Sequence, residues 1–414
     1  MLSKMIFTLE KNWIKTPKYF NIELDDNFIN DLKEMLKLST KLKLSYNFNK
    51  NIDRLGELND LTHIEFGKLF NKSIDKLGDN VEVIILGRNF NRKIEKMPKN
   101  LRLIEFGYSF DEYCEYGKNL KVIRYGSKFN RYVENLPEGL EILEFGWYYN
   151  KPLANIPKNL KELHFGLNFN HKLEGLPNSL YYLRLSRIYN YPVDNLPTSL
   201  KVLKLGRHFN QSLDNLPEGL LRLEINCCYD DSDFNGQVDN LPRSLISISF
   251  GKMFNNNVDN LPMGLKNIEF GMNFNQPVDM LPMNLETIRF GNDFNQEIAY
   301  LPPKLKKIIF GEKFNKPVNN LPSEVEQITF GENFNQPINN LPSGIEKIIF
   351  GRDFNQSVDN LPQNLRHVVF GENFQKPINN LPKKIKRIEL CNNYTLDTNV
   401  FFKKKIKLYD YFSN

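Results

Sequence analysis

Hydrophobic positions recur along most of this chain at a fixed interval. From Phe234 onward, an aromatic residue, usually followed by Asn, returns every twenty residues. This period predicts a repeat architecture, in place of the two or three globular domains that 414 residues would otherwise suggest. The eighteen aromatic positions are Phe48, Phe70, Phe90, Phe110, Phe129, Tyr149, Phe169, Tyr189, Phe209, Phe234, Phe254, Phe274, Phe294, Phe314, Phe334, Phe354, Phe374 and Tyr394.

Each unit has the pattern of one short strand between two turns. Ile268 and Phe270 alternate with polar residues, so we expect them to face one side of a strand. Gly271 suits the turn at the end of that strand. We expect Asn275 to point inward and to bond backbone groups of its own and the adjacent coil. Leu281-Pro282 excludes a helix interior and marks the return of the chain.

One unit cannot bury its apolar residues alone, whereas stacked units can. We therefore predict one solenoid domain over residues 41–395, with about 18 coils of about 20 residues. Its strands would form one long, curved parallel sheet, and twenty residues leave little room for a helix in each coil. The same letters persist because every coil must present the same edge to the next.

The repeat resembles two known patterns. The run L-x-x-I-x-F, followed by an inward Asn, is similar to the leucine-rich repeat. The string FNQPINNLP at 334–342 resembles the FNIP repeat, and the match extends over about residues 48–395. The resemblance implies a leucine-rich-repeat type of fold and an interaction scaffold, of a kind found in amoebae and in the giant viruses that infect them. It also implies, in some members, an F-box that recruits ubiquitin ligase. Residues 1–40 are shorter than an F-box requires, so a substrate-recruiting adaptor stays an alternative.

The chain has different sequence at its two ends. Residues 1–40 predict an N-terminal cap with a helix near 25–38, whose apolar face would contain Phe28, Leu32, Met35 and Leu36. The same helix could bind a partner. Residues 396–414 predict a basic C-terminal cap, in which Ile406 and Leu408 would face inward from a last strand.

Positive charge is concentrated at the C-terminal end. The net charge is +6, and residues 383–409 contain eight Lys or Arg against Glu389 and Asp397. The rest of the chain therefore balances to zero. A basic end can protect a sheet edge, or it can bind nucleic acid or an acidic partner. Because phosphate binding requires concentrated positive charge, nucleic acid is disfavoured for the body of the protein.

Outward strand positions carry the candidate binding residues, since packing does not constrain them. Much of one outward column alternates in charge from Glu105 to Glu224, as a solvated charge ladder would. Two apolar stripes interrupt the polar pattern, and exposed apolar stripes often mark interfaces. A flanking segment could cover either stripe instead. The residues are Ile309, Thr329, Ile349 and Val369 in the later stripe, and Val83, Leu103, Val122 and Ile142 in the earlier one.

Two coils depart from the pattern. Residues 226–233 replace three residues of the regular unit, and insertions in solenoids emerge as loops that often lie on a binding face. They include Cys227 and Cys228, which have no flanking base to activate a thiol. The coil at 110–128 lacks its Leu-Pro and has Asp111 in place of Asn, so we expect a local bend or weak point there.

Catalytic and metal-binding motifs are missing from the sequence. The five histidines are dispersed, and no HExxH, GxSxG or phosphate-binding Gly-rich loop occurs. We predict a protein that is not an enzyme and needs no cofactor or metal. Its function would be to bind a protein partner through the concave sheet face and the rim loops, and self-association through the same stripe stays open.

The sequence also suggests a compartment. No apolar run is long enough to span a membrane, and four scattered cysteines indicate neither a disulfide framework nor zinc. Asn71, Asn210 and Asn355 match the glycosylation motif, but an inward Asn could not accept a glycan. We therefore expect an intracellular protein, in the cytoplasm.

Overall fold

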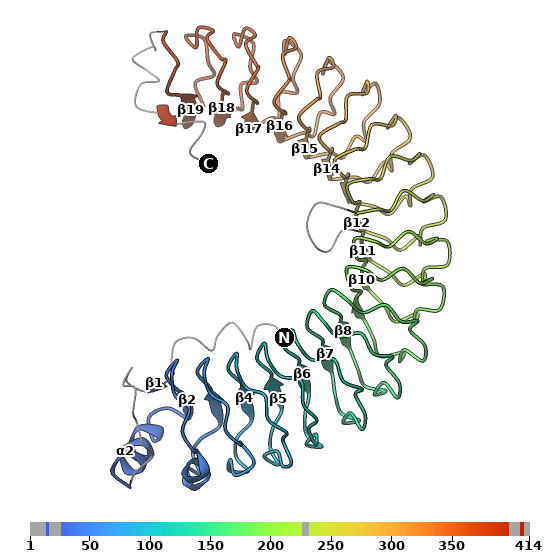
Figure 1. Cartoon of the computed structure of the whole chain (residues 1–414). Helices are drawn as coiled ribbons and strands as arrows, with labels where there is room; N and C mark the ends of the chain where they lie inside the picture. The colour runs from blue at the N-terminus through green and yellow to red at the C-terminus, as the bar shows by residue number, and fades with distance from the viewer. Residues whose placement is uncertain (1–13, 16–25, 226–231, 397–405, 410–414) are drawn as a thin grey trace. The chain divides into compact units, whose positions relative to one another are not determined.

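The computed structural model describes residues 14–15, 26–225, 232–396 and 406–409. The chain divides into two compact units, Met1–Tyr191 and Pro192–Asn414, called unit 1 and unit 2 below. Both are parallel β-solenoids with very little helix, and together they contain about 18 turns, as the repeat predicts. Within each unit the strands lie on the inner side of the curve that its coils follow (Figure 1).

Unit 1 begins with a short strand and a helix, and continues as a stack of three-residue strands. Neighbouring strands pair in parallel, each residue lying opposite its equivalent one coil on, as Ile104 lies opposite Ile123. A 3-10 helix, η1, lies in one coil at Asp53–Glu57. The elements of unit 1 are β1 (Ile14–Lys15), α2 (Asp26–Leu36), β2 (Lys41–Lys43), β3 (His63–Glu65), β4 (Val83–Ile85), β5 (Leu103–Glu105), β6 (Val122–Arg124), β7 (Ile142–Glu144), β8 (Glu162–His164) and β9 (Tyr182–Arg184).

Unit 2 continues the same plan, and its described elements are all strands. Its last strand pairs in parallel with the one before it, with Ile388 opposite Ile406. The strands of unit 2 are β10 (Val202–Lys204), β11 (Arg222–Glu224), β12 (Ser247–Ser249), β13 (Asn267–Glu269), β14 (Thr287–Arg289), β15 (Lys307–Ile309), β16 (Gln327–Thr329), β17 (Lys347–Ile349), β18 (His367–Val369), β19 (Arg387–Cys391) and β20 (Ile406–Tyr409).

Two tight turns explain the fixed letters of each coil. The Leu265 amide donates to the Pro262 carbonyl at 3.1 Å, which fixes the spacing Pro-x-x-Leu before each strand. The Phe274 amide donates to the Gly271 carbonyl at 3.3 Å, which fixes Gly-x-x-Phe after it. At Gly271 the neighbouring coil leaves no room for a side chain: a Cβ there would lie 1.8 Å from the Gly251 carbonyl oxygen.

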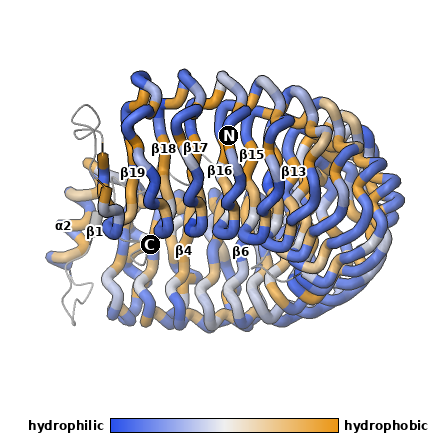
Figure 2. Tube along the Cα trace, turned by 90° about the horizontal axis from the view of Figure 1, so that it is seen from above, coloured by the Kyte–Doolittle hydropathy of each residue, from blue (hydrophilic) through white to orange (hydrophobic). Residues whose placement is uncertain are grey.

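The core consists of columns of like side chains. Figure 2 shows hydrophobic residues recurring at equivalent positions of the Cα trace from coil to coil. Ile268, Phe270 and Phe274 are buried, as are their equivalents in the other described coils except Tyr394, which is half-buried. Phe274 stacks on Phe254 at 6.0 Å between ring centroids, and on Phe270 of its own coil at 3.8 Å. This packing repeats in both units, so burial of the columns accounts for most of the repeat.

The repeat Asn does not point into the core, contrary to the prediction. Its side chain forms a ladder outside the core: the Asn295 amide donates to Asn275 Oδ1 at 2.9 Å, and the same bond recurs in most coils. Asn71 and Asn355 are half-buried and Asn210 is exposed. The argument that burial prevents glycosylation of these three residues is therefore wrong.

Asp111 keeps this ladder intact in the coil that was expected to be weak. Its amide donates to Asn91 Oδ1 at 2.9 Å, and its own Oδ1 accepts from the Asn130 amide at 3.0 Å. Ile94 and Cys114 add a parallel bridge beside it. A carboxylate oxygen therefore replaces the amide oxygen without breaking the column.

The ends differ in detail from the prediction. Helix α2 buries Ile29, Leu32 and Leu36, while Phe28 is half-buried and Met35 is 42% exposed. Strand β20 is present, but Leu408 is 56% exposed instead of facing inward. The insertion residues 226–231, with Cys227 and Cys228, and most of the basic end from residue 397 lie outside the described residues.

Candidate functional site

Each three-residue strand buries its middle residue and leaves the other two at the strand face. In β17, Ile348 is fully buried while Lys347 and Ile349 are half-buried. The face of each unit therefore carries two outward columns, one on each side of the buried Ile column. Both predicted stripes belong to these columns, because the strands pair in register.

The later stripe lies at the third strand position of unit 2. Ile309 lies opposite Thr329, Thr329 opposite Ile349, and Ile349 opposite Val369. All four side chains are half-buried. The structure therefore brings the four residues together as one column, which offers a narrow apolar strip beside polar neighbours.

Charged residues of opposite sign flank this stripe. Lys307 and Lys347 lie two residues before it on the same strands, at the first strand position. Glu312 and Glu332 follow it, directly after the glycines that end those coils' strands. The stripe thus has a basic side and a side that is acidic beside Ile309 and Thr329, whereas Arg352 takes the same position beside Ile349.

A groove runs beside the stripe at the ends of the strands in unit 2. Its volume is about 540 Å³, and its lining includes Ile309 and Thr329 together with Glu269, Arg289 and Glu312. The glycine column forms part of the groove. Two of the four stripe residues therefore border the hollow that a partner's side chains could enter.

The earlier stripe is less open than the sequence suggested. The structure aligns Val83, Leu103, Val122 and Ile142 in one column of unit 1. Val83 and Leu103 are half-buried, but Val122 and Ile142 are only 4% and 7% exposed. The latter two therefore offer almost no surface to a partner.

Ion pairs occupy the corresponding groove of unit 1, which measures about 300 Å³. Arg124 lies between two carboxylates on neighbouring strands, 3.5 Å from Glu105 and 3.2 Å from Glu144. The predicted charge ladder is thus present at the third strand position of this unit. Such pairs stabilise a strand face modestly.

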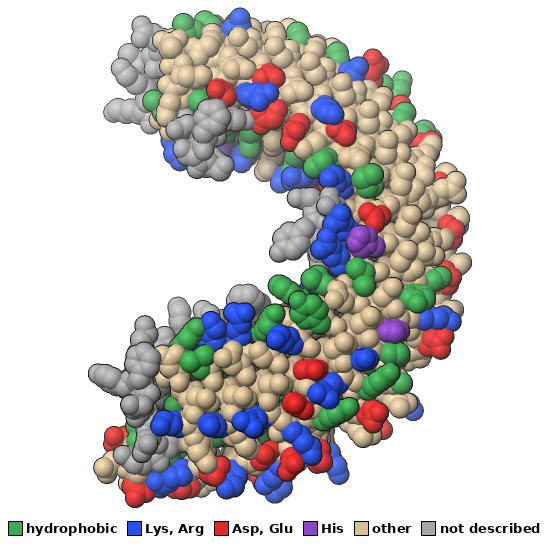
Figure 3. Space-filling model, viewed as in Figure 1, with side chains coloured by type: hydrophobic (Ala, Val, Ile, Leu, Met, Phe, Trp, Pro, Cys, Tyr) green, Lys and Arg blue, Asp and Glu red, His purple; other side chains and the backbone are tan. Residues whose placement is uncertain are grey.

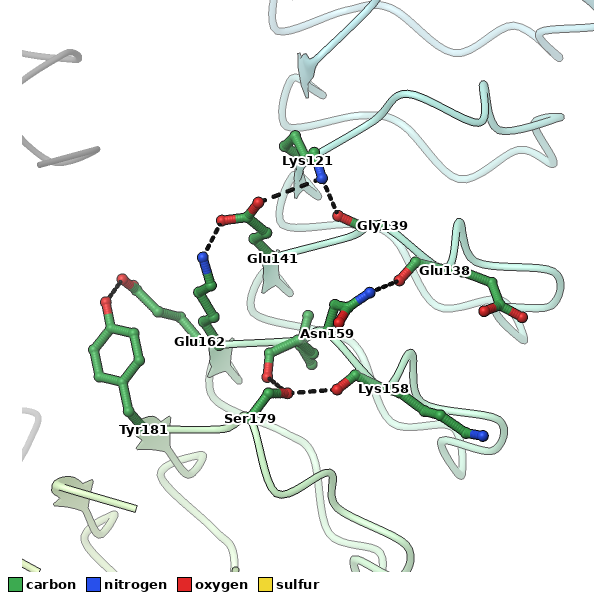
Figure 4. A network of polar contacts seen from close by, with 11 residues as sticks. Lys121, Glu138, Gly139, Glu141, Lys158, Asn159, Glu162, Ser179 and Tyr181 are labelled. Atoms are coloured by element: carbon green, nitrogen blue, oxygen red, sulfur yellow. Dashed lines mark hydrogen bonds and ion pairs between the residues drawn. The ribbon is translucent and has the colours of Figure 1, made fainter. Parts of the chain in front are cut away.

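Polar contacts also link successive coils on the N-terminal side of the strands (Figure 4). Glu141 lies between two lysines, 3.4 Å from Lys121 Nζ and 2.6 Å from Lys161 Nζ. The lysine partners, Lys161 first, hold the pKa of Glu141 below its usual value. The Tyr181 hydroxyl donates to Glu162 at 2.5 Å, and the Ser179 hydroxyl donates to the Lys158 carbonyl at 2.6 Å. These contacts join neighbouring coils and need no further role.

One group of ionisable side chains, with Tyr125 buried and Cys114 and Tyr116 half-buried, lies in and beside the irregular coil of unit 1. The Tyr116 and Tyr125 hydroxyls are hydrogen-bonded to each other. Loss of solvation raises the pKa of the Cys114 thiol to about 12, and it raises the pKa of both tyrosines well above 10.0. A protonated thiol is a poor nucleophile, so the cluster has the character of core packing.

The described residues contain no group of three His, Cys, Asp or Glu side chains that could hold a metal ion. Within the same residues, no helix has both the length and the apolar composition needed to cross a bilayer. These observations leave the strand faces and the coil edges as the surfaces to consider.

Sequence reasoning missed one surface. The residues that run from the glycine column to two positions past the ladder Asn form the turn edge of each unit. In unit 1 this edge carries eleven Lys or Arg and two acidic residues, Asp111 and Glu112. In unit 2 the same positions carry six Lys or Arg against seven Asp or Glu among the described residues. A count by repeat position would have found the difference, whereas the total charge conceals it.

Comparison with known proteins identifies the repeat. The model of the FNIP Repeat family matches residues 70–109, 149–187, 189–228, 254–293, 277–313, 314–353, 334–359 and 354–393. These matches cover more than half of the chain. Among curated proteins, no relative matches.

Two solved structures have similar folds. The chain is 28% identical to CroV588 of the giant virus CroV, described as a novel circular LRR protein structure; the match covers 94% of this chain and 71% of CroV588, with a TM-score of 0.70. It is 20% identical to YopM from Yersinia enterocolitica WA-314, over 84% of this chain and 76% of YopM, with a TM-score of 0.51. The second likeness concerns the fold alone.

Proposed function

The chain belongs to the FNIP Repeat family, and we propose that it is a non-catalytic scaffold that binds a protein partner through the strand face of unit 2. Solenoids of the leucine-rich-repeat type are typically interaction scaffolds without catalysis, and they commonly bind protein partners. The observation that carries the proposal is the half-buried stripe Ile309, Thr329, Ile349 and Val369 beside the groove.

The charges beside the stripe suit a partner of a particular chemistry. An apolar strip with Lys307 and Lys347 on one side and Glu312 and Glu332 on the other fits an amphipathic surface whose flanking charges are reversed. Apolar contact would supply most of the affinity, while the flanking charges would set orientation and the rate of association. The partner would therefore present apolar side chains between carboxylates that face Lys307 and Lys347 and cations that face Glu312 and Glu332.

In the earlier stripe, Val83 and Leu103 keep part of their side-chain surface exposed and could bind a second part of the same partner. Val122 and Ile142 are too buried for this role. We also propose that residues 1–40 and 396–414 cap the two ends of the array and protect them from solvent.

The proposal is tested with a photo-crosslinking amino acid at position 349 and, as the matched control, at position 249. Ser249 lies in the same column, five strands before Ile349 and at the end of the groove away from the stripe, and it is polar. A partner that is cross-linked from 349 and not from 249, identified by mass spectrometry, is then purified. Its affinity should fall at least tenfold for Ile349→Lys and should change little for Ser249→Lys, as measured by calorimetry. Equal loss in both variants would contradict the proposal.

Self-association is a distinct outcome of the same experiment. If the cross-linked partner is a second copy of this chain, light scattering should give a dimer for the unmodified protein and a monomer for Ile349→Lys. A monomer in both cases, with no partner cross-linked at 349, would refute binding through this stripe.

A further inference from the structure

We propose that the turn edge of unit 1 binds single-stranded nucleic acid. This surface is separate from the strand face of unit 2 and is independent of the protein-binding role proposed for it. It is defined by residues 45–51, 67–73, 87–93, 107–113, 126–132, 146–152, 166–172 and 186–191.

The edge is strongly basic although the chain as a whole is not. Its eleven cations are distributed over seven of the eight coils, so positive charge continues from coil to coil along the edge. Figure 3 shows that Lys and Arg also recur along the coils of this unit on the face in view. Phosphate binding requires positive charge that is concentrated on one surface, because counterion release depends on the local density of charge and not on the net charge of the whole chain. The cations are Lys50, Lys68, Lys72, Arg88, Arg92, Lys93, Lys128, Arg131, Lys151, Lys172 and Arg187.

Three of these cations form ion pairs with carboxylates of the described residues. Lys93 pairs with Glu95 at 3.1 Å and Lys172 with Glu174 at 2.7 Å. Arg131 lies 3.7 Å from Asp111 and 3.8 Å from Glu112, the two acidic residues of the edge itself. The Lys93 and Lys172 pairs are exposed, so a phosphate can compete with their carboxylates at modest cost, while the Arg131 pairs are half-buried.

Tyrosine rings accompany the cations. The five cation–π pairs found among the described residues all lie on this edge. Arg88 and Lys128, two coils apart, both lie over Tyr108, at 4.9 and 5.7 Å from the ring centroid. The other three pairs are Lys68 with Tyr46, Arg131 with Tyr113, and Lys151 with Tyr132.

Several rings of this edge are open to solvent. Tyr46, Tyr113 and Tyr132 are each 56% exposed, and Trp147 and Tyr148 are 53% and 47% exposed. Large exposed aromatic side chains are costly on a surface with no ligand. Next to cations they form the combination that single-strand binders use, in which bases stack on rings while the backbone follows the charge.

The dimensions also fit an extended strand. Ring centroids of successive coils lie 6.1 Å apart on this edge, as between Phe70 and Phe90, so eight coils give an edge of roughly 40 Å, which suits the 4–16 nucleotides that one single-strand-binding domain typically covers. An acidic protein would use the same cations but has no need of the aromatic series. The rings therefore favour nucleic acid over an acidic protein surface.

The experiment measures binding of the full chain to fluorescein-labelled poly(U) of about 16 nucleotides by fluorescence anisotropy. The logarithm of the affinity should fall linearly with the logarithm of salt concentration, by about 0.7 for each phosphate neutralised. The triple variant Lys68→Glu, Arg88→Glu, Lys128→Glu should bind at least about tenfold more weakly, with a slope shallower by about 2.

A matched variant in unit 2 controls for overall charge. Lys252, Lys313 and Arg352 occupy the same positions after the glycine column. Reversing these three charges should change the affinity far less than reversing the three in unit 1. Circular dichroism and thermal melting of both variants check that each is folded. Equal losses in the two variants would show non-specific attraction and overturn the proposal.

The rings separate nucleic acid from an acidic protein. The double variant Trp147→Ala, Tyr148→Ala should lower the affinity for poly(U) by about fivefold or more, whereas Tyr300→Ala, which removes an exposed ring from unit 2, should not. Unchanged affinity in the double variant, or polyglutamate competing as well as poly(U), would assign the edge to an acidic protein and overturn the proposal. If the affinity for poly(U) fell instead on neutralising Lys383, Lys384 and Lys386, binding would lie at the C-terminal end, and this result would also overturn the proposal.

Discussion

Units 1 and 2 have the same interior and different surfaces. In both, Phe columns stack at about 6 Å between ring centroids, and the Asn ladder links successive coils. Outside the core, unit 1 has a basic, aromatic turn edge and an ion-paired strand face, while unit 2 has a neutral edge and an apolar strip. Stacking constrains the inward columns alone, so the outward columns can diverge and carry recognition.

The shared interior gives the largest expected effect, and it should be equal in the two units. Phe106→Ala in unit 1 and Phe350→Ala in unit 2 remove buried rings from the same column, where exposure is 3% and 2%. Each should lower the free energy of unfolding by ~3–5 kcal/mol, because the ring's burial is lost and a cavity remains. Urea denaturation followed by circular dichroism measures both. A difference of more than about 2 kcal/mol would show that the two interiors are not equivalent.

The two apolar stripes should respond differently to a charge, with an effect of intermediate size. Ile142→Lys places an ammonium at a position that is 7% exposed, so we expect a loss of about 2 kcal/mol or more. Ile349→Lys alters a half-buried position on the strand face, where the new side chain can reach water, and should change stability by about 0.5 kcal/mol or less.

Thermal melting of the two variants side by side tests this difference. Similar melting temperatures for Ile142→Lys and the unmodified protein would mean that the earlier stripe is accessible to solvent, and Val122 and Ile142 would return as candidate contacts. Unfolding of Ile349→Lys would remove the later stripe from the proposed interface.

The periodic part of the fold was predictable from the sequence because it reflects one constraint repeated in every coil. The strand positions of Ile268 and Phe270, the glycine turn and the solenoid all follow from residues that must match their neighbours one coil away. The ladder Asn was misplaced because an amide that bonds backbone groups has the same sequence pattern inside or outside a core. Asp111 looked like a defect, but its carboxylate supplies the same acceptor.

The surface was less predictable. Burial of Val122 and Ile142 depends on how neighbouring side chains cover them, which alternation along one strand does not reveal. The basic edge was missed because charge was summed along the chain, while the fold sorts it by position in the repeat. Lys68 and Lys128 are sixty residues apart in sequence, yet both lie on one edge together with Arg88. The carboxylates that balance their charge lie mainly at other positions of the coils.

The smallest expected difference between the units lies in the ladder. In unit 2, Asn335 Oδ1 accepts from the Asn355 amide and from Gln356 Nε2, both at 3.0 Å. In unit 1, Asn150 Oδ1 accepts from the Asn170 amide alone, at 3.0 Å, because His171 in the Gln position contacts the Asn150 carbonyl instead.

At about 0.5–1.5 kcal/mol for each hydrogen bond, Asn335→Ala should cost ~1–3 kcal/mol and Asn150→Ala about half as much. Asn150→Asp serves as a control, since Asp111 shows that a carboxylate supports the ladder, and it should keep most of the stability. Urea midpoints compare the three variants, and a larger loss for Asn150→Ala than for Asn335→Ala would mean that the Gln column adds nothing to the coupling between coils.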